Sequence, residues 1–495
     1  MSSSSSRHNL MMTDKTNLPK IIQGGMGVGI SSWQLARTVS MHGQLGVVSG
    51  TAVAHTLARR LQDGDMDGYL NAAISQFPFP EITKRVVDRY LRIPEASIGK
   101  DKYKAVPMPT IDLGRDLMDL MVVANFVEVY LAKSGHQGVV GINLLEKIQV
   151  PTLASLYGAL LADVDYVLMG AGIPVHIPAV LDSLSQNLDT KLPVKIAEDE
   201  SKEPTFAYFS PSEFAEGMAL PKLNRPKFLA IVSSSTLATR LSRSITGSPD
   251  GFVVEAPIAG GHNASPRGKM ELDEMGEPIY GPRDEIDIPV IAALGMPFWL
   301  AGGYGTHEQL RYALSVGASG IQVGTAFAFC EESGMKTPLK HQILDEIKQG
   351  KGYVRTDPRS SPTGFPFKVV EASGTNGVPE TGVKRQRICD LGYLREPYRK
   401  ENGKIGYRCP SEPVDDYVKK GGKLEDTVGR QCLCNGLVST MGLGQERRNG
   451  SIELPIVTAG DDLKYVLRYF PEGKKTYNAV DVLTCLLGKK PIQIT

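Results

Sequence analysis

Apolar and polar positions follow one repeating pattern from Lys20 to about residue 330. Short apolar runs that end in small residues alternate with longer amphipathic stretches. This alternation is typical of repeated β-α units whose strands form a buried parallel sheet. The apolar runs predicted to be strands begin at Ile21, Gln44, Gly138, Asp165, Pro193, Phe228, Gly251, Phe298 and Gly320.

The run that begins at Pro193 does not fit this pattern. No stretch between Pro193 and Phe228 is long enough for a crossover helix, whereas PVKIA and TFAYFS (from Thr205) can pair as an antiparallel hairpin. Without PVKIA, eight strands remain, which predicts an α/β TIM (β/α)8 barrel with its functional groups in the loops after the strands. A doubly wound sheet is the alternative. Against it, GGMGVG (from Gly24) lacks the GxGxxG spacing, and no acidic residue ends the second strand.

The chain is longer than a minimal barrel needs, and the pattern divides it into parts. The helical insertion after the second strand forms either a cap over the barrel mouth or a peripheral helical pair. The parts we expect are a flexible N-terminal tail (1–17), the barrel (18–335) with a helical insertion (57–137) and loop insertions (193–226 and 263–286), and a C-terminal extension packed on the barrel (336–495).

Charge and composition exclude several classes of partner. The 55 basic and 54 acidic residues leave no net field to attract nucleic acid or a membrane surface, so we expect a small-molecule substrate. The most apolar helix-like run, 117–132, contains Asp119, Asn125 and Glu128, which argues against a membrane span. The N-terminus lacks a secretory apolar region and cysteines are few, so we expect a cytoplasmic protein.

Four cysteines in the extension form a candidate metal site. Four thiolates can enclose zinc or an iron–sulfur cluster, but the spacing contains no CxxC pair, so we expect reduced cysteines and no metal. Among the histidines outside the glycine-rich motifs we expect structural roles, although His176 follows the fourth strand and can reach the substrate. The cysteines are Cys389, Cys409, Cys432 and Cys434.

Two glycine-rich stretches carry the candidate chemistry. VVEAPIAGGHNASPRG, from Val253, passes from a strand into two glycines and His262, which combines close backbone approach with a proton-transferring side chain. Further on, two predicted strands end in Gly302-Gly303 and Gly324-Thr325, each followed by a helix. In a barrel, the loops after the last two strands commonly bind phosphate, because glycine lets backbone N–H groups approach the anion.

These motifs together resemble the FMN-dependent nitronate monooxygenases, formerly called 2-nitropropane dioxygenases, and the related flavin enoyl reductases. The resemblance covers roughly residues 20–335, and the pieces occur in the family's order. They are IIQGGMG (Ile21), GVVGINLL (Gly138), VDYVLMGAGIP (Val164), AIVSSSTLA (Ala230), EAPIAGGH (Glu255), LAGGYGT (Leu300) and GASGIQVGT (Gly317).

The resemblance implies an FMN-binding barrel and assigns roles to matching positions. His262 matches the active-site histidine of the family, and Asn143 would hydrogen-bond the polar edge of the flavin ring. Ser233 is a weaker candidate for a flavin contact. The remaining residues implied in cofactor binding are Gly24, Gly25 and Met26 along the ring, and Gly260, Gly261, Gly302, Gly303, Gln322, Val323, Gly324 and Thr325 around the ribityl phosphate.

Two sites in this motif depart from the family. Glu255 stands where the family usually has glutamine, and Ile258-Ala259 replaces the usual Glu-Ala. A carboxylate near a flavin phosphate is repelled. We therefore expect Glu255 to turn away, to pair with Arg267 or Arg283, or to contact the ribityl hydroxyls of the cofactor.

The resemblance implies oxidation of alkyl nitronates or nitroalkanes with O2 to a carbonyl compound and nitrite. An alternative is an NAD(P)H-dependent enoyl or quinone reductase on the same barrel. A flavin-binding interaction protein without turnover is an alternative of another class. By analogy with other barrels of this kind, a homo-oligomer is possible.

Overall fold

The computed structural model describes residues 18–65, 67–91, 101–199 and 203–489. Eight parallel strands close into a barrel in the order β1-β10-β9-β8-β7-β4-β3-β2. The predicted TIM barrel is therefore confirmed, and the tail expected over residues 1–17 lies outside the described residues. The barrel strands are β1 (Ile21–Gln23), β2 (Leu45–Ser49), β3 (Val140–Leu145), β4 (Tyr166–Gly170), β7 (Lys227–Val232), β8 (Gly251–Glu255), β9 (Phe298–Ala301) and β10 (Gly320–Val323).

The strands read as continuous apolar runs because both of their faces are buried. Alternate side chains fill the barrel interior, among them Val47, Leu168 and Trp299, and the positions between them pack outward against the helices. The Trp299 indole donates to the Pro19 carbonyl at 2.8 Å, so this buried aromatic group is satisfied. The expected antiparallel hairpin outside the barrel is formed by β5 (Thr190–Val194) and β6 (Thr205–Phe209), and only Pro193 and Val194 of PVKIA belong to β5.

Helices surround the barrel, and several begin directly after a strand because a hydroxyl caps them. Ser32, Ser234 and Thr306 each accept a hydrogen bond from a backbone N–H in the first turn. The helices up to the end of the barrel strands are α1 (Trp33–Met41), α2 (Val53–Gln62), α3 (Tyr69–Ile74), α4 (Pro80–Tyr90), α5 (Arg115–Lys133), α6 (Thr152–Leu161), α7 (Ile177–Ser185), α8 (Pro211–Phe214), α9 (Ser235–Ser242), α10 (Ile288–Ala292), α11 (His307–Ser315) and α12 (Thr325–Ala328), with a 3-10 turn at Pro282–Asp284.

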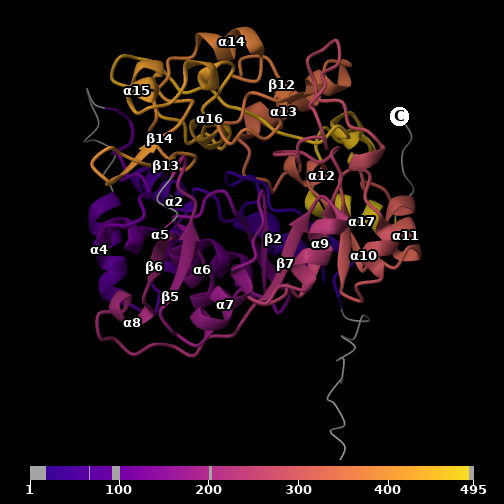
Figure 1. Ribbon diagram of the computed structural model, residues 1–495. Coiled ribbons are helices and arrows are strands. Elements are labelled where there is room, and N and C mark those ends of the chain that lie inside the picture. Colours follow the sequence, from indigo (N-terminus) through magenta and orange to yellow (C-terminus); the bar gives the residue numbers. More distant parts are fainter. Residues whose placement is uncertain (1–17, 66, 92–100, 200–202, 490–495) are drawn as a thin grey trace, which may run out of the picture.

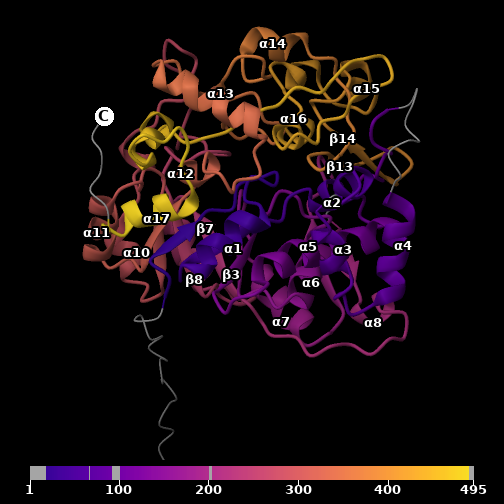
Figure 2. The same ribbon diagram turned by 180° about the vertical axis from the view of Figure 1, so that it is seen from behind.

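The insertion expected over 57–137 needs correction. Residue 57 lies inside α2, and α5 is the crossover helix between β2 and β3, packed on α1 and α6 of the outer ring. Helices α3 and α4 pack against α5 at the side of the barrel (Figure 2). The described part of the insertion is therefore a peripheral pair, and it does not cap the mouth.

The C-terminal extension forms a layer over one end of the barrel (Figures 1 and 2). It contains two antiparallel hairpins joined by short helices and irregular segments. The elements are α13 (Thr337–Lys348), β11 (Tyr353–Asp357), β12 (Phe367–Glu371), α14 (Pro379–Lys384), β13 (Glu396–Arg399), β14 (Ile405–Arg408), α15 (Val414–Lys419), a 3-10 turn (Leu424–Thr427), α16 (Leu433–Thr440), a 3-10 segment (Leu463–Tyr469) and α17 (Ala479–Leu486).

The last helix, α17, belongs to the outer ring of the barrel. It packs against α1, α11 and α12, and the Leu486 carbonyl lies 3.0 Å from Nδ1 of His307 at the start of α11. Helix α12, which follows the eighth strand, has only four residues and cannot fill the gap between α11 and α1. The extension thus completes the barrel that it covers. In the described part of the chain, no helix is long and apolar enough to cross a membrane.

A buried ion pair holds two distant segments of the extension together. Nη2 of Arg385 lies 2.7 Å from Oε2 of Glu453, and the two side chains are only 10% and 6% exposed. We expect Arg385→Ala to lower the free energy of unfolding by about 3–5 kcal/mol, because Glu453 would stay buried without its partner. Urea denaturation measures the loss.

The matched control is Lys348→Ala. Lys348 pairs with Asp345 at the surface, where the side chains are 36% and 64% exposed. This change should cost less than about 1 kcal/mol. Equal losses for the two variants would show that the Arg385 pair does not hold the extension.

Candidate functional site

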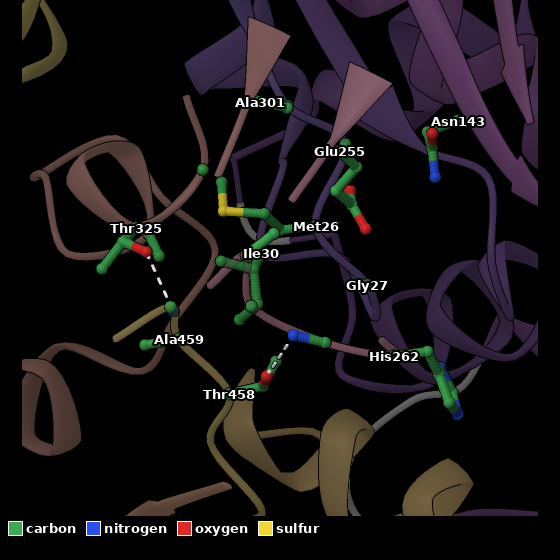
Figure 3. Close-up of a pocket in the computed structure, with 18 of the residues that line it drawn as sticks. Met26, Gly27, Ile30, Asn143, Glu255, His262, Ala301, Thr325, Thr458 and Ala459 are labelled. Atoms are coloured by element: carbon green, nitrogen blue, oxygen red, sulfur yellow. Dashed lines mark hydrogen bonds between the residues drawn. The ribbon is translucent and has the colours of Figure 1, made fainter. Parts of the chain in front are cut away.

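A cavity of about 210 Å³ opens at the carboxyl ends of the barrel strands. Residues at the carboxyl ends of β1, β3, β8, β9 and β10 and in the loops after them line it on one side, and the C-terminal extension lines it on the other. Figure 3 shows Glu255 and Asn143 entering from the barrel, opposite Thr458 and Ala459 of the extension. The cavity is therefore built from two parts of the chain that are far apart in sequence.

All but one of the residues that the resemblance assigns to catalysis or cofactor binding line this cavity. The exception is Ser233, which lies beyond the end of β7, next to the helix cap Ser234, while Ile231 supplies the cavity contact from β7. The residues brought together are Gly24, Gly25, Met26, Asn143, Glu255, Gly260, Gly261, His262, Gly302, Gly303, Gln322, Val323, Gly324 and Thr325.

Close packing explains why two of these positions are glycine. A Cβ atom on Gly25 would lie 2.1 Å from Cβ of Asn143, and one on Gly260 would lie 2.7 Å from the carbonyl carbon of Ala459. Neither neighbour can move easily, because Asn143 is buried in β3 and Ala459 contributes its backbone. Gly25 and Gly260 thus let the chain pass close to the cavity on both sides.

Backbone N–H groups at the ends of β9 and β10 point to an anion site. Gly302 and Gly303 have φ of +84° and +80°, a conformation that favours glycine. The N–H groups of Gly302, Gly303 and Gly324 make no hydrogen bond to any residue in the described ranges. Unpaired backbone donors beside a cavity are the groups that bind phosphate in barrels.

His262 is held by the extension. Its Nε2 lies 2.7 Å from the Oγ of Ser361, and its ring packs edge-on against Phe367 with centroids 4.8 Å apart. Burial, and after it the positive charge of Lys147, lowers the pKa of His262 to about 4. The imidazole is therefore neutral near pH 7 and can accept a proton or donate its N–H.

Glu255 brings a carboxyl group into the cavity without a partner. It has no hydrogen bond or ion pair with the described residues, so the expected pairing with Arg267 or Arg283 is not observed. Burial alone raises the pKa of this carboxyl to about 7. Glu255 and Gln322 both stand in register with Ala301 of β9, and Gln322 Oε1 is likewise buried without a partner. The side chains of Glu255 and Gln322, which lack hydrogen-bond partners among the described residues, therefore lie on either side of the small Ala301 side chain in the cavity.

The C-terminal roof was missing from the sequence prediction. The Gly261 N–H donates to Thr458 Oγ1 at 2.8 Å, and the Gly460 N–H donates to Thr325 Oγ1 at 3.0 Å (dashed in Figure 3). These bonds tie the segment 456–462 to the loops after β8 and β10. Among the residues that the prediction did not include are Met335, Phe367, Leu437, Thr440, Ile456, Val457, Thr458, Ala459, Gly460 and Asp462. The only local signal for them is the glycine in TAGDD (from Thr458).

The other candidate groups lie elsewhere. The four cysteines of the extension are free thiols, and no set of three His, Cys, Asp or Glu that could hold a metal occurs among the described residues. His176 lines a different cavity, beside β5, together with Glu146 and Lys195. His55 is buried in α2 against Tyr393, in keeping with a structural role.

Comparison with known proteins gives partial matches. Residues 183–354 match the family model described as nitronate monooxygenase. A probable nitronate monooxygenase of Bacillus subtilis is 30% identical over 171 residues, 33% of this chain and 43% of the relative. The nitronate monooxygenase of Pseudomonas aeruginosa is 30% identical over 131 residues, 26% of this chain and 35% of the relative.

A third relative has a different name. The (3aS,4S,5R,7aS)-5-hydroxy-7a-methyl-1-oxo-octahydro-1H-indene-4-carboxyl-CoA dehydrogenase of Rhodococcus jostii is 25% identical over 157 residues, 32% of this chain and 39% of the relative. The chain thus spans less than half the length of the curated relatives it matches. Among solved structures, FabK from Thermotoga maritima is 14% identical, with 95% of this chain and 92% of that chain covered and a TM-score of 0.46.

The unpaired carboxyl of Glu255 predicts a pH-dependent stability. Between pH 4.5 and 7 the folded protein keeps a proton on Glu255 that the unfolded chain has lost, so this group destabilises the fold as pH rises. Glu255→Gln removes this fall in the free energy of unfolding, because the amide does not titrate. Urea denaturation at pH 4.5 and 7.5 should show the variant gaining about 2 kcal/mol relative to the natural protein between the two pH values.

Glu274→Gln serves as control, because Glu274 is exposed in the loop after β8. The difference in free energy of unfolding between this variant and the natural protein should be the same at both pH values. A constant difference for Glu255→Gln as well would mean that the carboxyl is solvated or paired in solution.

Proposed function

We propose that the protein is an FMN-dependent oxidoreductase that oxidises alkyl nitronates or nitroalkanes with O2 to a carbonyl compound and nitrite, and the match of residues 183–354 to the nitronate monooxygenase model supports this proposal. The observation that carries the proposal is a neutral, half-buried His262 at a cavity whose glycine loops present unpaired backbone N–H groups. This combination offers an acid–base group beside an anion site.

The cavity fits a flavin mononucleotide in its hydrogen-bonding groups. The N–H groups of Gly302, Gly303 and Gly324 would bind the phosphate, and no lysine or arginine lies among the residues that line the cavity. Gln322 and Glu255 would meet the ribityl hydroxyls, which would give Gln322 Oε1 the hydrogen bond that it lacks and Glu255 a polar partner in the cavity. Gly24, Gly25, Met26 and Asn143 would flank the ring.

A bound flavin supplies two-electron chemistry, taking electrons from a carbon acid or nitronate and passing them to O2. The protein has to orient the substrate and manage its proton. Nδ1 of His262 has no hydrogen-bond partner among the described residues and is free to take a proton from the carbon next to a nitro group. The roof residues Ile456, Val457 and Ala459 exclude water from the same space.

A second candidate is an NAD(P)H-dependent reductase or dehydrogenase of enoyl or acyl thioesters. The observation that favours it is the partial similarity to a carboxyl-CoA dehydrogenase of Rhodococcus jostii. Glu255, where glutamine is usual among the nitronate monooxygenases, also leaves room for a different substrate. A flavin-binding protein without turnover is the third possibility, and it predicts a coloured protein that neither substrate class reduces.

Anaerobic reduction separates these possibilities. We expect ethylnitronate or nitroethane to bleach the flavin absorbance of the purified protein, whereas NADPH alone should not. Replacing His262 with Asn should slow bleaching by nitroethane about 10²- to 10⁴-fold while the flavin stays bound, because positioned acid–base groups contribute in this range. His176→Asn is the control, since His176 lines another cavity, and it should react at the natural rate.

Rapid bleaching by NADPH with no response to the nitro compounds would favour the reductase. A purified protein that takes up no flavin would contradict both enzyme proposals.

The close contact at Gly260 predicts a separate effect on cofactor retention. Gly260→Ala places a methyl group 2.7 Å from the backbone of Ala459, so the roof must move away from the cavity. We expect flavin affinity, measured by fluorescence titration of the apoprotein, to fall at least tenfold. Gly114→Ala is the control because a Cβ there meets nothing within 4 Å. Unchanged affinity in Gly260→Ala would show that the roof does not close the flavin site.

A further inference from the structure

We propose that Ser361 and Thr363 form a proton relay that carries the proton taken up by His262 to a second cavity. The proposal rests on the role of His262 in the proposed function. Ser361 Oγ lies 2.7 Å from His262 Nε2 and 2.8 Å from Thr363 Oγ1. Ser361 is fully buried, whereas Thr363 is half-buried and lines a cavity of about 250 Å³ that Glu146 and Lys147 also border.

The relay residues are fixed in place by the backbone around them. They lie between β11 and β12, and the Lys368 N–H donates to the Gly261 carbonyl at 2.9 Å. The Asn263 N–H donates to the Pro366 carbonyl at 2.9 Å, so the chain is held on both sides of His262. Arg430 donates to the Arg359 carbonyl at 2.8 Å and to the carbonyl of Ser361. Ser361 is therefore positioned against the imidazole by several independent contacts.

The hydrogen bonds allow one proton to pass without charging the imidazole. Ser361 has a single hydroxyl hydrogen, which is directed either to Nε2 of His262 or to Thr363 Oγ1. When Nδ1 takes a proton from the substrate carbon, the Nε2 proton moves to Ser361 Oγ. The Ser361 proton moves to Thr363 Oγ1, and the Thr363 proton leaves to water. One proton enters, one leaves, and no electron is moved.

A relay is useful here because His262 holds an extra proton poorly. Burial and Lys147, from the loop after β3, lower its pKa, and Arg430 adds a second positive charge near Ser361. The carboxyl groups on the two sides are Glu255, across the flavin cavity, and Glu146, at the second cavity, and burial raises the pKa of both. A proton that left through Thr363 would therefore reach a cavity that has a carboxyl group able to accept it.

Thr363→Val tests the relay apart from mere support of the ring. This change keeps the contact of Ser361 with His262 but removes the hydroxyl that leads to the second cavity. We expect the variant to reduce its flavin with nitroethane about tenfold or more slowly. Its rate with ethylnitronate, which has already lost the proton, should be unchanged. If Ser361 only orients the ring, both rates will stay within twofold of the natural protein, and the relay is overturned.

The neighbouring Ser360 supplies a matched control. It is also fully buried, but its hydroxyl has no hydrogen-bond partner among the described residues. Ser360→Ala should leave both rates unchanged. A selective loss with nitroethane in this variant would attribute the effect to packing and overturn the relay.

A readout that needs no turnover separates failure of the relay from failure of the proposed function. In the natural protein, the ring N–H of His262 should exchange with water through Ser361 and Thr363. NMR of the ¹⁵N-histidine-labelled holoprotein, with His262→Asn for assignment, should show this exchange slowed at least tenfold in Thr363→Val. Equal exchange rates overturn the relay whether or not nitro compounds are substrates. If exchange slows while neither nitro compound reduces the natural protein, the relay stands and the substrate assignment falls.

Discussion

The functional cavity depends on a short backbone bridge between the loop after β8 and the strand β12. Hydrogen bonds from Lys368 to Gly261 and from Asn263 to Pro366 lie on either side of His262. Since Gly261 also donates to Thr458, three segments of the chain meet at this one residue. The position of the imidazole, its contact with Ser361 and the closure of the roof all follow from this junction. Without it, His262 would sit on a free loop at the mouth of an open barrel.

The barrel and its glycine loops could be predicted because their signals are local. Each strand is a short run buried on both faces; Gly24 follows such a run directly, Asn143 lies within one, and His262 lies in the loop after one. The roof could not be predicted in this way. Thr458 is 197 positions from Gly261, and the short apolar run before it, Pro455 to Val457, does not reveal which part of the chain it packs against. Ser361 likewise reads as part of a turn, and only the folded chain brings it to the histidine.

The differences between the sequence-based predictions and the structure also have physical causes. Helix α5 is almost entirely buried because it is covered by the barrel on one side and by α3 and α4 on the other. Its sequence therefore lacks the amphipathic pattern of an outer-ring helix and looks like part of an insertion. Ser233 fails as a cavity residue because β7 ends at Val232, where the chain turns into α9.

The contact of α17 with α1 has a consequence for how the protein is made. The outer ring of the barrel closes only when a helix beginning at Ala479 docks beside one beginning at Trp33. During synthesis, the apolar faces of α1 and α11 stay uncovered until nearly the whole chain has left the ribosome. Joining such distant segments is slow and leaves apolar surface exposed to aggregation in the meantime. The order of synthesis thus leaves these apolar faces of the nascent chain without their final cover until α17 has been made.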